Sequence, residues 1–327
     1  INKIIKQYSL MIESIEQESF KSAKLERLQK ELHQNTTKAS VSFRQLSRLF
    51  SMLDSANNPI MALLLNGCFL YHIHGLKALI HWKTEKAKYL ENWLAIIGEF
   101  EMLNSLANFS YNNPTFTFPV LNDDYEVSFT EMSHPLLNEN NRVANTISFQ
   151  PQSFIILTGS NMSGKSTFLR SLGVNMVLAG IGSVVCATKA SIHPMPILVS
   201  MRLSDSLADS ESYFYAEIKR LKQIMDALEN KRSFVLLDEI LRGTNSDDKR
   251  SGTVAVIQKM VAQNAIGAIA THDIEVCLIT NDNPEQLINK CFEAEIHQND
   301  LHFDYKLRDG ICKNKSATFL MQKIGVI

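Results

Sequence analysis

The chain has 327 residues, of which 45% are hydrophobic and 20% charged, and its formal net charge is −1. This composition is typical of a globular protein with room for two domains, and it excludes a disordered or fibrous chain. The near-zero net charge also excludes an overall basic field that would attract nucleic acid. Residues 1–118 carry 13 basic and 10 acidic side chains, and the rest of the chain carries 20 and 24. We therefore expect any contact with nucleic acid to be a local patch on the first part.

The cysteines and the first residues indicate the setting of the protein. Five cysteines, an odd number without C-x-x-C spacing, fit neither a disulfide framework nor a metal site. Together they favour a reducing, cytoplasmic compartment. The sequence begins at Ile1 inside a helical pattern and shows no signal peptide, so we expect a piece of a longer protein.

Residues 1–118 are predicted to be helical almost throughout. Apolar residues recur at helical spacing from Ile5 to Leu32, with Lys and Glu between them. Breaks are expected at residues 57–59 and 111–114, where asparagine precedes proline. Helices that pack on their neighbours are the simplest explanation of this pattern, and a long lever arm or coiled segment is the alternative.

One apolar run, residues 60–80, is long enough to raise the question of a membrane helix. It is interrupted by polar residues and a glycine, namely Asn66, Gly67, His72, His74 and Lys77. Such groups are costly in lipid, so we expect a buried core helix and no membrane segment.

After Pro119, short β-rich runs alternate with helical patterns. Strands are predicted at residues 153–158, 197–201, 234–237 and 266–270, helices at 166–179, 212–228 and 251–263, and a terminal hairpin at 292–297 and 301–305. This alternation predicts an α/β domain over residues 119–327 with a mostly parallel sheet.

The first chemical motif is a complete G-x-x-x-x-G-K-[ST] pattern at residues 159–166, between a predicted strand and a predicted helix. Small residues let successive backbone N–H groups point at phosphates, and the helix N-terminus adds its positive end. Lys165 can bridge the β- and γ-phosphates, and the Ser166 hydroxyl can ligate Mg²⁺. The predicted ATP-binding residues of this loop are Gly159, Ser160, Asn161, Met162, Ser163, Gly164, Lys165, Ser166 and Thr167.

Two carboxylates follow the buried strand at residues 234–237. Asp238 is predicted to hold Mg²⁺, and Glu239 to polarise the attacking water as general base. His272 ends the next strand, which we expect to lie beside the first, so a γ-phosphate sensor is favoured over a structural histidine. Glu239, Lys165 and His272 are the predicted catalytic residues.

These motifs resemble those of the MutS family of DNA mismatch-repair ATPases, across a helical lever or core region and the ATPase domain. The resemblance rests on residues 158–167 with Asn161 and Met162 inside the loop, on 237–240 with 242–244, on 133–135 with Asn145, on 100–107, and on 305–307 with Gly310. It implies a P-loop ATPase of the ABC type that acts as a homodimer with composite ATP sites. It also implies that His134, Pro135 and Asn145 contact the adenine.

The resemblance further implies that a signature segment, here residues 205–217, reaches the ATP of the other subunit through Ser212. The family's Ser-Gly-Arg-Ser pattern is replaced by Asp209-Ser210-Glu211-Ser212. Glu211 adds negative charge close to the expected position of the γ-phosphate, which opposes tight closure on ATP.

A mismatch-reading member of this family would carry a Phe-x-Glu wedge in an N-terminal domain. Phe129-Thr130-Glu131 matches that triplet but falls in the ATPase part, where we interpret it as a chance match. The sequence therefore predicts an ATPase that hydrolyses ATP with Mg²⁺ to drive conformational change on DNA, without evidence of mismatch recognition. Two alternatives stay open: a nucleotide-gated clamp with slow or vestigial hydrolysis, and an ABC-type subunit that serves a non-DNA partner such as a transporter or an SMC-like complex.

Overall fold

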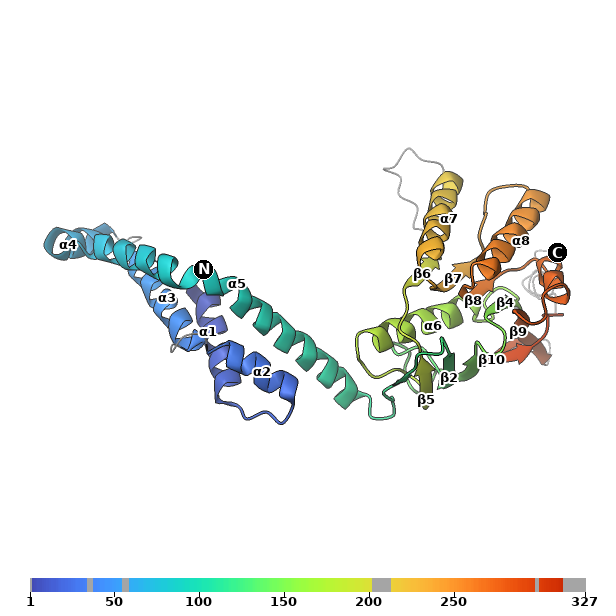
Figure 1. Ribbon diagram of the computed structural model, residues 1–327, viewed down its shortest axis with the longest axis horizontal. Coiled ribbons are helices and arrows are strands. Elements are labelled where there is room, and N and C mark those ends of the chain that lie inside the picture. Colours follow the sequence, from blue (N-terminus) through green and yellow to red (C-terminus); the bar gives the residue numbers. More distant parts are fainter. Residues whose placement is uncertain (1, 34–37, 55–58, 202–212, 298–299, 314–327) are drawn as a thin grey trace. The chain divides into compact units, whose positions relative to one another are not determined.

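The computed structural model describes residues 2–33, 38–54, 59–201, 213–297 and 300–313. The chain divides into two compact units, Ile1–Asn108 and Phe109–Ile327. Helix α5 (Tyr71–Asn112) carries the chain from the first unit into the second (Figure 1). Each unit has a hydrophobic core of its own.

The first unit is built of helices. Besides α5 these are α1 (Asn2–Gln17), α2 (Ala23–Glu31), α3 (Ala39–Asp54) and α4 (Pro59–Phe69). Apolar side chains on one face of each of α1, α2, α3 and α5 meet in one core, which includes Ile12, Leu28, Phe43, Trp93 and Ile97. The rings of Phe43 and Trp93 lie 5.8 Å apart between centroids. The helical prediction is confirmed, and these four helices pack on their neighbours.

The expectation of a single buried helix over residues 60–80 is wrong. Leu70 has a positive φ of 49°, which ends α4 and separates it from α5. The buried face of α5 is centred instead on Gly75, Trp82 and Trp93, and the indole N–H of Trp82 donates to the main-chain oxygen of Ser42 at 3.0 Å. Large apolar side chains along the run are therefore exposed, namely Leu63, Phe69, Leu70, Ile73, Leu76 and Ile80. No helix among the described residues is long and apolar enough to cross a membrane.

The second unit is centred on a six-stranded sheet in the order β10-β9-β4-β8-β7-β6. Its strands are β4 (Phe154–Gly159), β6 (Ile197–Ser200), β7 (Phe234–Asp238), β8 (Ile266–Ala270), β9 (Leu287–His297) and β10 (Asp300–Asp309). Neighbours from β9 to β6 pair in parallel, and β10 pairs with β9 antiparallel. The predicted strands and the terminal hairpin are confirmed, and the fold class is α/β.

The central strands are buried on both faces because apolar residues fill both sets of alternating positions. Ile155 and Leu157 of β4 join a core with α6 (Lys165–Gly180). Phe154 and Ile156 join a second core. This second core contains residues of α7 (Tyr213–Asn230), α8 (Ser246–Ala262) and the 3₁₀ helix η2 (Glu275–Asn281). Figure 1 shows α6 on one side of the sheet and α7 and α8 on the other. The result is a layered α/β unit.

A smaller four-stranded sheet, in the order β1-β5-β2-β3, covers the core on the α6 side. Its strands are β1 (Val120–Leu121), β2 (Val127–Met132), β3 (Asn145–Ser148) and β5 (Lys189–Ile192). Phe129 lies in β2 and is 1% exposed. The Phe-x-Glu triplet is thus part of a core strand, in agreement with its interpretation as a chance match.

Candidate active site

The loop after β4 strongly favours glycine at two positions. A Cβ at Gly159 would lie 2.6 Å from Ser163 Oγ and 2.9 Å from the Phe292 main-chain oxygen. Gly164 has φ 103° and directly precedes α6, and a Cβ there would lie 3.1 Å from the Tyr305 ring. The glycines therefore let the backbone curl tightly between the buried strand and the N-terminus of α6, which is the arrangement that binds anions.

Lys165 is the first residue of α6 and is turned back into the loop. Its Nζ donates to the main-chain oxygens of Gly159 at 2.7 Å and Ser160 at 2.9 Å, and it lies 3.5 Å from Nε2 of His272. The side chain is 5% exposed. Burial lowers the pKa of Lys165, while the neighbouring carboxylates of Glu239 and Asp238 oppose this effect. The Lys165 amine thus points into the loop, where phosphate oxygens of a ligand could replace the two carbonyl oxygens as its hydrogen-bond acceptors.

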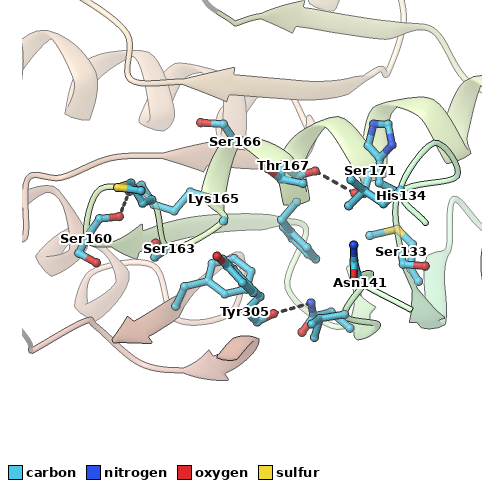
Figure 2. A pocket seen from close by; sticks show the side chains of 18 of the residues that line it. Ser133, His134, Asn141, Ser160, Ser163, Lys165, Ser166, Thr167, Ser171 and Tyr305 are labelled. Carbon is cyan, nitrogen blue, oxygen red and sulfur yellow. Dashed lines mark hydrogen bonds between the residues drawn. The ribbon is translucent and has the colours of Figure 1, made fainter. Parts of the chain in front are cut away.

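A pocket of about 460 Å³ opens beside this loop. Figure 2 shows Ser160, Ser163 and Lys165 on one side, Ser133, His134 and Asn141 on the other, and Tyr305 between them. Of the residues predicted from the sequence, those that line the pocket are Ser160, Asn161, Met162, Ser163, Gly164, Lys165, Ser166, Thr167, His134, Asn145 and Glu239. Gly159, Pro135, Asp238 and His272 are not among its lining residues.

Asn145 has a role that the sequence did not reveal. Its Nδ2 donates to the Tyr305 main-chain oxygen at 3.0 Å, and its Oδ1 accepts from the Leu307 N–H at 2.7 Å. The pairing of β9 with β10 shifts register between Phe303 and Leu307, and Tyr305 has φ 54°. Asn145 therefore fixes an irregular part of β10 that presents Tyr305 to the pocket. Both polar atoms of its amide are used in doing so.

His134 is less constrained. Its Nδ1 accepts a hydrogen bond from the Leu136 N–H at 3.3 Å. Burial lowers the pKa of His134, and the Arg170 guanidinium lowers it further. A neutral imidazole in the pocket wall can face the flat surface of a base.

The two carboxylates stand at the end of β7. Asp238 is 4% exposed, and its Oδ1 has no hydrogen-bond partner among the described residues. Glu239 follows with φ 51°. Its Oε1 lies 2.7 Å from His272 Nε2, and its Oε2 lies 2.6 Å from Arg242 Nη2. The hydrogen bond from His272 is the main reason that the pKa of Glu239 falls to about 2, although burial opposes the shift. The expected adjacency of the two strands is confirmed, because Asp238 pairs with Ala270 of β8.

The donor set fits a magnesium ion. The buried Asp238 Oδ1 needs a partner, since an unsatisfied buried oxygen is costly. Ser166 offers a hydroxyl from the first turn of α6, within the pocket lining. Carboxylate and hydroxyl oxygens are the hard ligands that Mg²⁺ prefers. Ser212, the residue expected to act on the ATP of the other subunit, lies outside the described residues.

These features define an α/β protein in which a glycine loop, a buried lysine and two carboxylates lie at the carboxyl ends of β4 and β7, with β8 between these two strands. Residues 155–325, just over half of the chain, match the family model described as MutS domain V. The chain belongs to the MutS family.

Several curated proteins are similar to this chain. The DNA mismatch repair protein MutS of Thermotoga neapolitana is 31% identical over 233 residues, which is 69% of this chain and 29% of that protein. The MutS of Ehrlichia chaffeensis is 38% identical over 180 residues, 54% of this chain and 22% of that protein. The MutS of Halothermothrix orenii is 29% identical over 251 residues, 74% of this chain and 28% of that protein. The chain thus spans less than a third of the length of these relatives.

Proposed function

We propose that this chain binds ATP with Mg²⁺ at the loop of residues 159–166 and hydrolyses it. The observation that carries the proposal is the convergence on one pocket of the Lys165 amine, the free N-terminus of α6 and the Glu239 carboxylate. A cationic loop is complementary to a triphosphate, and a carboxylate beside it is complementary to the attacking water.

The pocket has a suitable size and an apolar end for the base. Its volume of about 460 Å³ lies within the usual range of small-molecule sites. His134 supplies a flat ring on the side of the pocket opposite Lys165, and the Tyr305 ring lies between the two sides, next to Gly164 (Figure 2). We assign the adenine to this end. Asn145 acts indirectly in this assignment, because it holds the part of β10 that carries Tyr305.

The residues at or after the ends of β4, β7 and β8 have separate roles in the proposed hydrolysis. Mg²⁺, when bound by Ser166 and Asp238, would neutralise charge that builds up on the phosphates. Lys165 would exchange its carbonyl acceptors for phosphate oxygens. Glu239 would orient and polarise the attacking water, and His272 would contact the γ-phosphate while it positions Glu239.

The wider role is part of the same proposal. The relatives are named as DNA mismatch repair proteins, which supports DNA as the partner on which ATP drives conformational change. An ABC-type homodimer with composite sites, in which Ser212 reaches the partner's ATP, would complete each half-site. The structure shows the five cysteines as thiols and not as half-cystines, which supports the proposed cytoplasmic setting.

The proposal is tested by calorimetric titration of the parent and of Lys165→Ala with ATP and Mg²⁺. We expect Lys165→Ala to lose high-affinity binding because it removes the cationic contact to the phosphates, with an unchanged circular dichroism spectrum. Lys222→Ala is the matched control, since Lys222 is exposed and pairs with Asp226 on α7. Equal ATP affinity in all three proteins would contradict the assignment of the site.

A further inference from the structure

Both carboxylate oxygens of Glu239 are engaged in this structure. Oε1 lies 2.7 Å from His272 Nε2, and Oε2 accepts a 2.6 Å hydrogen bond from Arg242 Nη2. Arg242 Nε also donates to the Glu239 main-chain oxygen at 3.1 Å. A carboxylate that activates water must present an oxygen to that water. Arg242 takes one acceptor position of the oxygen that His272 leaves open and places a cation beside it.

Arg242 is itself anchored from another element. Its main-chain N–H donates at 3.1 Å to Oε2 of Glu217, a carboxylate of α7 that is 5% exposed. The turn from Glu239 to Arg242 is tightly wound, because Glu239 and Leu241 have φ of 51° and 59°. These values lie in the left-handed region, which residues with a side chain disfavour. Arg242 does not line the pocket. Its contacts therefore act on the turn that carries Glu239, and not on the nucleotide.

We propose that Arg242 is a positioning residue that keeps Glu239 idle in the resting protein, and that Glu217 links this restraint to helix α7. The inference rests on the proposed ATP hydrolysis. Withdrawal of the guanidinium from Oε2 leaves Glu239 held by His272 alone, with one oxygen available to water. Because Glu217 binds the main chain of Arg242, a shift of α7 against β7 moves the backbone from which the guanidinium extends. Helix α7 thereby controls whether Glu239 can act.

The strength of the Arg242–Glu239 contact sets the expected change in turnover. The ion pair is partly enclosed, with side-chain exposures of 28% for Arg242 and 19% for Glu239, and its hydrogen bond is charge-assisted. Contacts of this kind are worth about a threefold to tenfold change in an equilibrium. We expect Arg242→Ala to raise the turnover number by about threefold to tenfold. The KM for ATP should stay within about twofold, because Arg242 does not line the pocket.

The test is steady-state ATP hydrolysis with Mg²⁺ by the parent, Arg242→Ala and a matched control, Arg27→Ala. Arg27→Ala removes the same charge from an exposed pair with Glu31 in the helical unit. The turnover of this variant should therefore equal that of the parent. In the Glu239→Gln background, Arg242→Ala should produce no rise, because the restraint acts only through Glu239. A general loosening of the fold would not show this dependence.

Two further variants examine the link to α7. Glu217→Ala removes the acceptor of the Arg242 N–H and should raise turnover by a smaller factor than Arg242→Ala. Glu217→Gln keeps an acceptor oxygen and should match the parent. If the circular dichroism spectrum of Arg242→Ala shows that this variant is unfolded, Arg242→Lys replaces it. A smaller rise is expected, because lysine keeps the positive charge and loses only the guanidinium fork.

The outcomes separate this inference from the proposed function. A parent that turns over ATP, with unchanged or lower turnover in the Arg242 variant, overturns the restraint and leaves the ATPase standing. A rise that persists in the Glu239→Gln background also overturns it. A parent without any turnover refutes the proposed hydrolysis, and this inference falls with it.

Discussion

The ionised carboxylate of Glu239 should make the second unit markedly more stable at neutral pH than at acid pH. Its pKa falls from 4.5 to about 2 in the folded protein, and each pKa unit corresponds to about 1.36 kcal/mol. The shift therefore contributes about 3 kcal/mol to the free energy of unfolding. The carboxylate is 19% exposed, so solvent screens it little.

The direction of the pH effect follows from the lowered pKa. A carboxyl group that is more acidic in the folded state stabilises the protein at pH values above its unfolded pKa. This contribution is lost as the pH falls through the folded pKa. In Glu239→Gln, which cannot ionise, the loss relative to the parent should be about 3 kcal/mol at pH 7 and about half of that at pH 3. Glu139→Gln is the control, because that side chain is 71% exposed.

The assay must report on the correct unit. Both tryptophans, Trp82 and Trp93, lie in the helical unit, so their fluorescence does not follow the unfolding of the α/β unit. Urea titrations by ¹⁹F NMR of fluorophenylalanine-labelled protein avoid this problem, since Phe154 and Phe234 are fully buried in the central sheet. A difference between parent and Glu239→Gln that is near zero at pH 7, or the same at pH 7 and pH 3, would refute the reasoning.

Three further predictions concern the loop, the hairpin and the metal. Gly164→Ala should destabilise the second unit by about 1–3 kcal/mol in urea titrations, because a side chain at φ 103° also meets Tyr305. Asn145→Ala should cost about 1–3 kcal/mol and speed hydrogen exchange at the Leu307 amide, since two hydrogen bonds to β10 are lost. Asp238→Asn should leave metal-free ATP binding intact but abolish most of the gain in affinity on adding Mg²⁺, as measured by titration calorimetry. An unchanged stability, an unchanged exchange rate or an undiminished magnesium effect would contradict the respective assignment.

The central strands could be predicted from the sequence because their signals are local. Apolar runs of four to six residues at β4, β7 and β8 are buried on both faces. Parallel neighbours then bring the residues after each strand to one edge of the sheet. For this reason Lys165, Glu239 and His272, which are far apart in sequence, could be expected to meet.

Other features depend on contacts that no local pattern encodes. Tyr305 reaches the pocket only because β10 shifts register and Asn145 fixes the irregular part. The break at Leu70 within residues 60–80 carries no local signal, because leucine has no turn propensity. Helix α8 begins at Ser246, five residues before the predicted start at residue 251. The sequence did hold a signal for this start, because asparagine is a favoured N-cap residue. In the structure the Asn245 side chain caps α8 by accepting from the Asp248 N–H at 2.8 Å.

The most direct test of the account is a single-turnover measurement with radiolabelled ATP and Mg²⁺ on the parent and on Glu239→Gln. Both proteins should bind ATP with similar affinity, because the Lys165 loop is intact in each. The parent should release phosphate, and Glu239→Gln should do so at least about a hundredfold more slowly, since general-base contributions are typically of this size. Equal rates in the two proteins, or no phosphate release by the parent, would contradict the claim that this pocket is an ATPase centre driven by Glu239.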